Sequence, residues 1–167
     1  MSRKPARASL GQALIELAAG LLVFLPLVLL AIDCSVIMIA VSSNEAACRD
    51  AARAASSGPP GLAVTGPAHT LTAGARPYKR ALSVIKDLYA AAGFLKISEN
   101  LKVTELLRSP LPQAPEGGPY IGEISVETTA EVYPPFLIRV FSENGCFQFK
   151  STQKYPFTYV QPASSGY

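Results

Sequence analysis

The feature that most constrains this chain is a long apolar run near its N-terminus. Leu17–Ile32, with the sequence LAAGLLVFLPLVLLAI, carries no formal charge, and a further apolar stretch follows at residues 36–41. Together they span roughly 25 residues, and an α-helix needs about 20 to cross the hydrocarbon core of a bilayer. Residues 2–8 carry three basic residues and no acid, which predicts that this end stays in the cytoplasm. We therefore expect one membrane-spanning helix that includes Leu17, Pro26 and Ile32.

A cleaved secretory signal is the main alternative for this segment. Such signals have an apolar core of about 7–15 residues that ends at a small-residue cleavage site. The apolar core here is longer, and no convincing Ala-x-Ala site follows it. A lipoprotein signal does not fit either, because Ala-Ile-Asp precedes Cys34 where a small-residue box is required. The sequence favours a retained helix.

The composition argues against several classes of protein. The net charge of +3 is small and the basic residues are scattered after the N-terminus, whereas a nucleic-acid binder gathers them on one face. The chain has three cysteines without a CxxC pair and a single histidine, His69, so it lacks the usual zinc spacings. We expect no metal, cofactor, nucleic-acid partner or catalytic residue. Glu123 and Glu127, on one face of an expected strand, are interpreted as solvent-facing.

The cysteines leave one question open. If the C-terminal part is exported, Cys48 and Cys146 could form a disulfide; otherwise both are free thiols. Cys34 lies in the apolar segment and is interpreted as a small hydrophobic residue.

Glu16 stands directly before the apolar run. A charge at the centre of a membrane helix raises the free energy of insertion by about 2.5–3.5 kcal/mol, and each large apolar residue lowers it by about 0.3–0.6 kcal/mol. The apolar run can therefore insert into the membrane even with one acid, Glu16, near its edge. Glu16 either reaches the interface or meets a positive partner within an assembly of packed helices.

The segment Gly11-Gln12-Ala13-Leu14-Ile15-Glu16, after its basic leader, resembles the processing site of type IV prepilins. This resemblance implies that a prepilin peptidase cuts between Gly11 and Gln12, which makes Glu16 the fifth residue of the mature chain. The Glu16 carboxylate can then pair with the new α-amino group of a neighbouring subunit and set the register between subunits.

The stretch GQALIELAAGLLVFLPLVLLAID, with Pro26 in mid-span, is similar to TadE-like pseudopilins of tight-adherence (Tad, Flp-type) pilus systems. So is NEAACRDAARAAS at residues 44–56, and the resemblance covers residues 3–56. Leu17 departs from the aromatic residue that is frequent in the family, and Gln12 departs from the phenylalanine that begins most type IV pilins.

The rest of the chain predicts a small α+β head. We divide the sequence into a basic leader (1–11), a transmembrane and extended helix (12–57), a Pro/Gly-rich loop (58–77) and an exported head (78–167). In the head we expect a helix at Tyr78–Phe94, strands at 101–107, 121–133, 136–141, 147–152 and 155–160, and a tight hairpin turn at Glu143–Gly145. The strands should form an antiparallel sheet of three or four strands.

These features predict a minor pilin or pseudopilin, stored in the membrane for assembly or initiation of a Tad-type pilus. The implied partners are the prepilin peptidase, other pilin and pseudopilin subunits, the inner-membrane assembly platform and the lipid bilayer. The expected location is the bacterial inner membrane, with the head in the periplasm or outside the cell. The alternative is an uncleaved single-pass protein whose head is an adhesion or binding module, with the contact residues Tyr120, Tyr133, Tyr155 and Tyr159.

Overall fold

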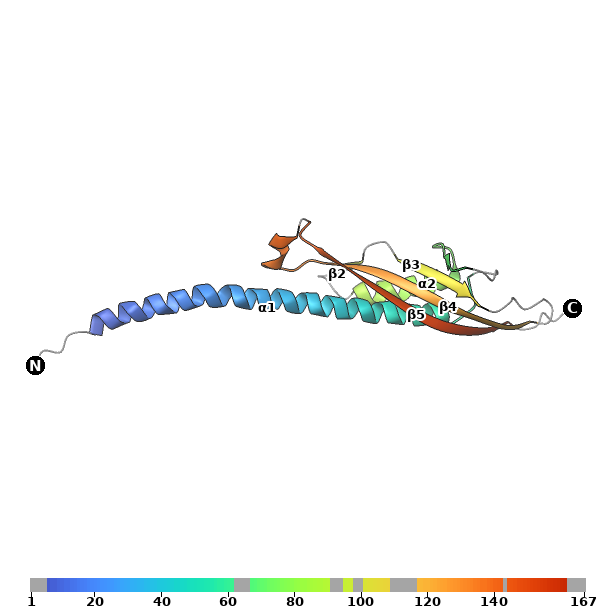
Figure 1. The fold of residues 1–167 in the computed structure, drawn as a ribbon, viewed down its shortest axis with the longest axis horizontal. Coiled ribbons are helices and arrows are strands. Elements are labelled where there is room, and N and C mark those ends of the chain that lie inside the picture. Colours follow the sequence, from blue (N-terminus) through green and yellow to red (C-terminus); the bar gives the residue numbers. More distant parts are fainter. Residues whose placement is uncertain are drawn as a thin grey trace, which may run out of the picture.

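The computed structural model describes residues 6–61, 67–90, 95–97, 101–108, 117–142 and 144–161. A small head packs against the C-terminal half of one long helix, and the N-terminal half of that helix extends alone (Figure 1). The elements are α1 (Ala6–Ser56), β1 (His69–Thr70), α2 (Arg76–Ala90), β2 (Leu95–Ile97), β3 (Lys102–Leu107), β4 (Gly118–Val132), the 3-10 helix η1 (Ile138–Phe141) and β5 (Phe147–Gln161). The α+β prediction is confirmed.

The long helix α1 has 51 residues, which at 1.5 Å per residue gives a length of about 77 Å. It begins at Ala6, within the segment expected to be a leader, and ends at Ser56. Pro26 lies inside α1 without ending it. A helix this long has no single environment, and its two halves differ in what they contact.

The C-terminal half of α1 presents a face of small side chains to the head. The buried positions recur at the three- and four-residue spacings of one helical face, and they are Asp33, Ala40, Asn44, Ala47, Cys48, Ala51, Ala52 and Ala55. Alanine adds little volume to the helix, so the sheet can approach the α1 backbone closely. Alanine also has the highest helix propensity, so the same residues favour both the helix and the packing.

The sheet is built around β4. Strand β5 pairs antiparallel with β4 along its whole length, from Gly118↔Gln161 to Val132↔Phe147. On the other edge of β4, β3 pairs with residues 122–127 and β2 with the last three residues, and β1 adds to β3. The described strands therefore form one five-stranded antiparallel sheet, one strand more than the upper end of the prediction. Two of these strands were not predicted: β1, which lies in the segment expected to be a loop, and β2.

The core lies between this sheet and the two helices. Ile85 of α2 is buried with Val103, Ile124, Val126 and Val132 of the sheet. Inward residues alternate with outward ones along β3 and most of β4, as expected for strands buried on one face. In α2, Ile85 is buried and Leu88 is exposed.

The segment between β4 and β5 corrects two predictions. Phe136–Phe141 was expected as a strand, but its residues form η1 and a bend, and Asp33 of α1 binds two of the backbone N–H groups. The expected tight hairpin at Glu143–Gly145 is also wrong. Gly145, with φ of 64°, donates its N–H to the Ser142 carbonyl in a local turn, but β4 and β5 are joined by the whole of residues 133–146.

The last strand also differs from the prediction. Residues 147–152 and 155–160 were expected as two strands, yet β5 is continuous from Phe147 to Gln161. Proline lacks an N–H and is tolerated at a sheet edge. Among the described strands, β5 pairs only with β4, so Pro156 needs no donor on its other side.

The structure does not form the Cys48–Cys146 disulfide that the sequence left open. Both cysteines are free. The Cys48 thiol is buried on α1, 3.4 Å from the Ser151 carbonyl oxygen, whereas Cys146 precedes β5. Five residues of strand separate Ser151 from Cys146, about 16 Å at the rise of a β-strand, which is too far for a disulfide.

Candidate assembly site: the free half of the helix and its junction with the head

The free half of α1 is an apolar rod. Between Gly11 and Ile32 every residue is exposed except Leu29, which is half-buried. Large hydrophobic side chains along it are 38–75% exposed, from Leu14 to Ile32. At 1.5 Å per residue this stretch is about 33 Å long, close to the roughly 30 Å of a bilayer core. Among the described residues, one helix is long and apolar enough to cross a membrane.

Glu16 lies at the start of this rod. The Gln12 side-chain amide donates a hydrogen bond of 3.1 Å to the Glu16 carboxylate, one helical turn away. Both side chains are exposed. Within the part of the chain whose side chains are described, Glu16 forms no ion pair, and the ion pairs present join residues of the head. The carboxylate therefore faces outward and can be reached by a partner.

The fold itself does not require glycine at position 11. A Cβ atom at Gly11 would meet no atom within 4 Å, and the same holds at Gly20. Neither residue has a positive φ. Glycine inside a helix is less favourable than alanine by about 1 kcal/mol. Packing within this chain therefore gives no reason for glycine at either position.

Asp33 marks the point where the rod meets the head. It is fully buried, and its two carboxylate oxygens accept hydrogen bonds from the backbone N–H of Phe136 at 3.0 Å and of Ile138 at 2.8 Å. These bonds hold the start of η1 against α1. The sequence shows only an acid at the end of an apolar run; its partners lie more than a hundred residues away.

Two further polar side chains of α1 fix the head to the helix. Asn44 donates to the Phe149 carbonyl at 3.2 Å and accepts from the Thr128 hydroxyl at 2.9 Å. It thereby connects α1 with both long strands. The Cys48 thiol lies 3.2 Å from the Val126 carbonyl oxygen. Sequence reasoning did not identify the roles of these two residues.

The side chain of Arg80, from α2, caps the C-terminal end of α1. Its guanidinium donates to the carbonyls of Ala54 at 3.0 Å, Ala55 at 2.7 Å and Pro59 at 3.2 Å. Helix ends leave carbonyls without partners inside the helix, and Arg80 supplies donors to them. Partial burial lowers the pKa of the Arg80 guanidinium, while the buried carboxylate of Glu105 acts in the opposite direction.

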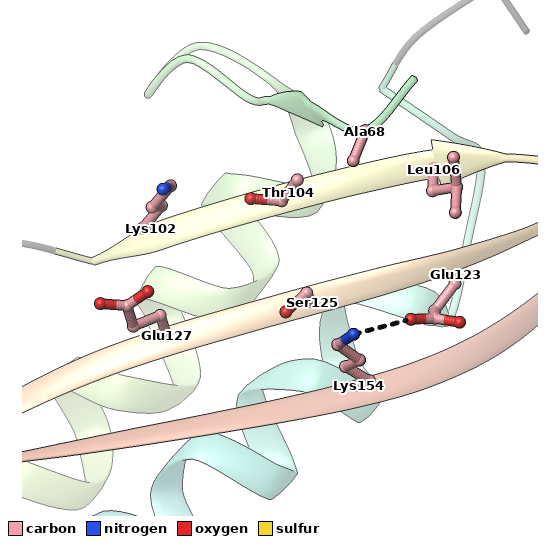
Figure 2. Close-up of a pocket in the computed structure, with 8 residues that line it drawn as sticks. All are labelled: Ala68, Lys102, Thr104, Leu106, Glu123, Ser125, Glu127 and Lys154. Carbon is pink, nitrogen blue, oxygen red and sulfur yellow. Dashed lines mark ion pairs between the residues drawn. The ribbon is translucent and has the colours of Figure 1, made fainter. Parts of the chain in front are cut away.

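The solvent face of the sheet carries a hollow lined by alternating charges (Figure 2). Glu123 is 2.7 Å from the Arg108 guanidinium and 3.8 Å from Lys154, and Glu127 is 3.6 Å from Lys150. Each acid therefore lies beside a cation on a largely exposed surface, where such pairs contribute little to stability. Figure 2 shows Glu123 and Glu127 apart on β4, with Ser125 between them.

The tyrosines considered as contact residues belong mostly to the packing of the head. Tyr120, Tyr155 and Tyr159 pack against the core while partly exposed. The rings of Tyr120 and Tyr159 are 6.3 Å apart, and the Arg53 guanidinium lies 5.7 Å from the centre of the Tyr155 ring. They do not form a free aromatic surface.

This arrangement fits a single-pass membrane protein, because one helix that is long and apolar enough to cross a bilayer also carries a small α+β head. Residues 11–53 match the family model described as TadE-like protein. The matched segment contains Gly11, Gln12, Glu16, the rod and most of the face that contacts the head. The resemblance found in the sequence is thus confirmed, and it is consistent with a TadE-like pilin of a tight-adherence system. Comparison of the chain with curated proteins and with solved structures finds no match.

Proposed function

We propose that this protein is a minor pilin or pseudopilin that is stored in the bacterial inner membrane and takes part in assembly or initiation of a Tad-type pilus. Its N-terminus faces the cytoplasm, and its head lies in the periplasm or outside the cell. A prepilin peptidase, other pilin subunits and the inner-membrane assembly platform are its partners. Its role is structural, without catalytic residues.

The observation that carries this proposal is the free half of α1. An exposed apolar rod needs either lipid or other helices around it, because apolar surface of this size is not stable in water. A pilin helix is surrounded by lipid while it is stored in the membrane and by neighbouring helices in the filament. The TadE-like match over the same residues supports this interpretation.

Gly11 and Glu16 give the proposal its two chemical features. Glycine at position 11 is unnecessary for the fold, since its position is open and its φ is ordinary. A requirement outside the fold, such as recognition by the peptidase, accounts for it. Cleavage there creates an α-amino group at Gln12, and the exposed Glu16 carboxylate can pair with that group on a neighbouring subunit. Such a pair compensates two charges in a low-dielectric environment, where an unpaired charge is costly.

The intact mass of the protein from its native membranes tests the processing step. We expect a chain that starts at Gln12, with or without N-methylation. A mass that includes residues 1–11 contradicts the processing step. A start beyond Val41 means that the segment is a secretory signal and that the topology is wrong.

The Glu16→Ala substitution tests the assembly step. We expect normal insertion and abundance in the membrane but reduced piliation, because the partner amine loses its counter-charge. Glu16→Gln is the matched control, since it keeps the shape and a hydrogen-bonding oxygen but removes the charge, and it should fail in the same direction. Normal piliation in both variants contradicts the role of Glu16 in subunit register.

The alternative is an uncleaved anchor whose head is an adhesion or binding module. A mass that includes the leader, together with ligand binding by the membrane-embedded protein, favours this alternative. The partial burial of Tyr120, Tyr155 and Tyr159 leaves it without a defined contact surface.

A further inference from the structure

The loop around η1 exposes large apolar side chains that the head does not use. Val140 is 80% exposed and Phe141 is 85% exposed, and Phe136 nearby is 44% exposed. No residue of η1 is buried. Arg139 lies between these side chains in sequence and is also exposed. An exposed apolar cluster with a basic residue beside it is typical of a segment that contacts a membrane interface.

The position of the loop places it at that interface. Asp33, which follows the last residue of the rod, holds the backbone of Phe136 and Ile138. Figure 1 shows this loop at the end of the head nearest the free half of α1. The exposed apolar side chains of this loop therefore lie next to the end of the apolar rod, to one side of α1.

The length of the apolar rod gives the depth of Asp33, where the rod meets the head, relative to the bilayer core. From Leu17 to Asp33 the axial rise is about 24 Å, and from Gly11 it is about 33 Å. The hydrocarbon core is about 30 Å thick. Whether Leu17 or Gly11 marks the inner edge of the core, Asp33 lies within about 6 Å of the outer edge. The head cannot be placed above this helix without bringing η1 to the level of the lipid interface.

We propose that residues 136–141 form a lipid-contacting foot of the head while the protein is stored in the membrane. Phe141 and Val140 enter the outer interface of the bilayer, and the Arg139 guanidinium lies at the level of the phosphate groups, with which it can form bidentate hydrogen bonds. Asp33 fixes the foot to the helix, so that the head has a defined orientation on the membrane. The inference rests on the membrane-spanning helix and not on the pilus role, so either can fail without the other.

The absence of tryptophan from the chain allows a direct test. Phe141→Trp introduces a single fluorophore at an exposed position, where the fold does not depend on the side chain. Val160→Trp is the matched control: Val160 is 66% exposed, but it pairs with Pro119 at the opposite end of the sheet. The full chain is reconstituted at low density in phosphatidylcholine vesicles, with and without brominated acyl chains, and tryptophan emission is recorded.

We expect brominated lipid to quench F141W several-fold more than V160W, with a blue-shifted emission for F141W alone. Equal and weak quenching of the two variants overturns the proposal, because the loop would then lie in water. A blue-shifted F141W emission without quenching also overturns it, because the loop would then be covered by protein, such as a second copy of this chain.

Discussion

The hydrogen bonds of Asp33 make the junction between membrane helix and head sensitive to one substitution. In Asp33→Ala, the N–H groups of Phe136 and Ile138 lose both carboxylate acceptors, at 3.0 and 2.8 Å in the native protein. The removed carboxylate is fully buried, so water replaces it only if the loop moves away from α1. We therefore expect the η1 loop to open while the sheet remains intact.

The magnitude follows from the two bonds. A hydrogen bond to a charged group contributes about 1.5–3 kcal/mol. Once the loop opens, its N–H groups bind water, so we take the lower value for each bond and expect the closed loop to lose about 3 kcal/mol. Since each 1.4 kcal/mol is a factor of ten, the opening equilibrium shifts by roughly a hundred-fold.

Amide hydrogen exchange of the full chain in membrane-mimetic discs measures this shift. Peptides that cover residues 134–142 should exchange roughly a hundred-fold faster in D33A, and peptides from β4 and β5 should keep their native rates. Asp33→Asn is the control for shape, because it keeps one carbonyl acceptor and should lie between the native protein and D33A. If residues 134–142 exchange at the native rate in D33A, the carboxylate does not hold the loop and the reasoning is wrong.

Two further predictions concern the attachment of the head to α1 and the packing of Gly122 in the sheet. For both, the free energy of unfolding is measured by chemical denaturation of the full chain in detergent micelles. Asn44→Ala and Thr128→Val should each destabilise the head by about 1–3 kcal/mol because each removes a buried hydrogen bond. The double variant should show a coupling of about 0.5–3 kcal/mol, and simple additivity would contradict the Asn44–Thr128 bond. Gly122→Ala should cost about 1–3 kcal/mol, because its Cβ would lie 2.6 Å from the Leu106 carbonyl oxygen and 2.7 Å from the Phe157 ring. Gly74→Ala, where a Cβ meets nothing within 4 Å, is the control, and equal losses in the two glycine variants would refute the steric explanation.

The errors in the sequence-based strand assignments share a physical cause. Residues 136–141 have the composition of a strand, but they do not pair, because Asp33 takes up two of their N–H groups. Residues 147–152 and 155–160 were predicted as two strands, but the pairing of β5 with β4 continues between them and through Pro156. In both cases, partners distant in the sequence override local propensity.

The long apolar helix, the TadE-like segment and the α+β class could all be predicted from the sequence alone. Hydrophobicity, helical spacing and the offset between Gly11 and Glu16 are properties of neighbouring residues, so they can be read without a structure. The folded chain is needed to see that Asp33 holds the η1 loop, that Asn44 connects α1 to both long strands, and that Cys48 is buried far from Cys146. These contacts join residues 84 to 105 positions apart. Periodicity along the chain carries no information about which buried polar group meets which partner, because that is set by how the sheet packs on the helix.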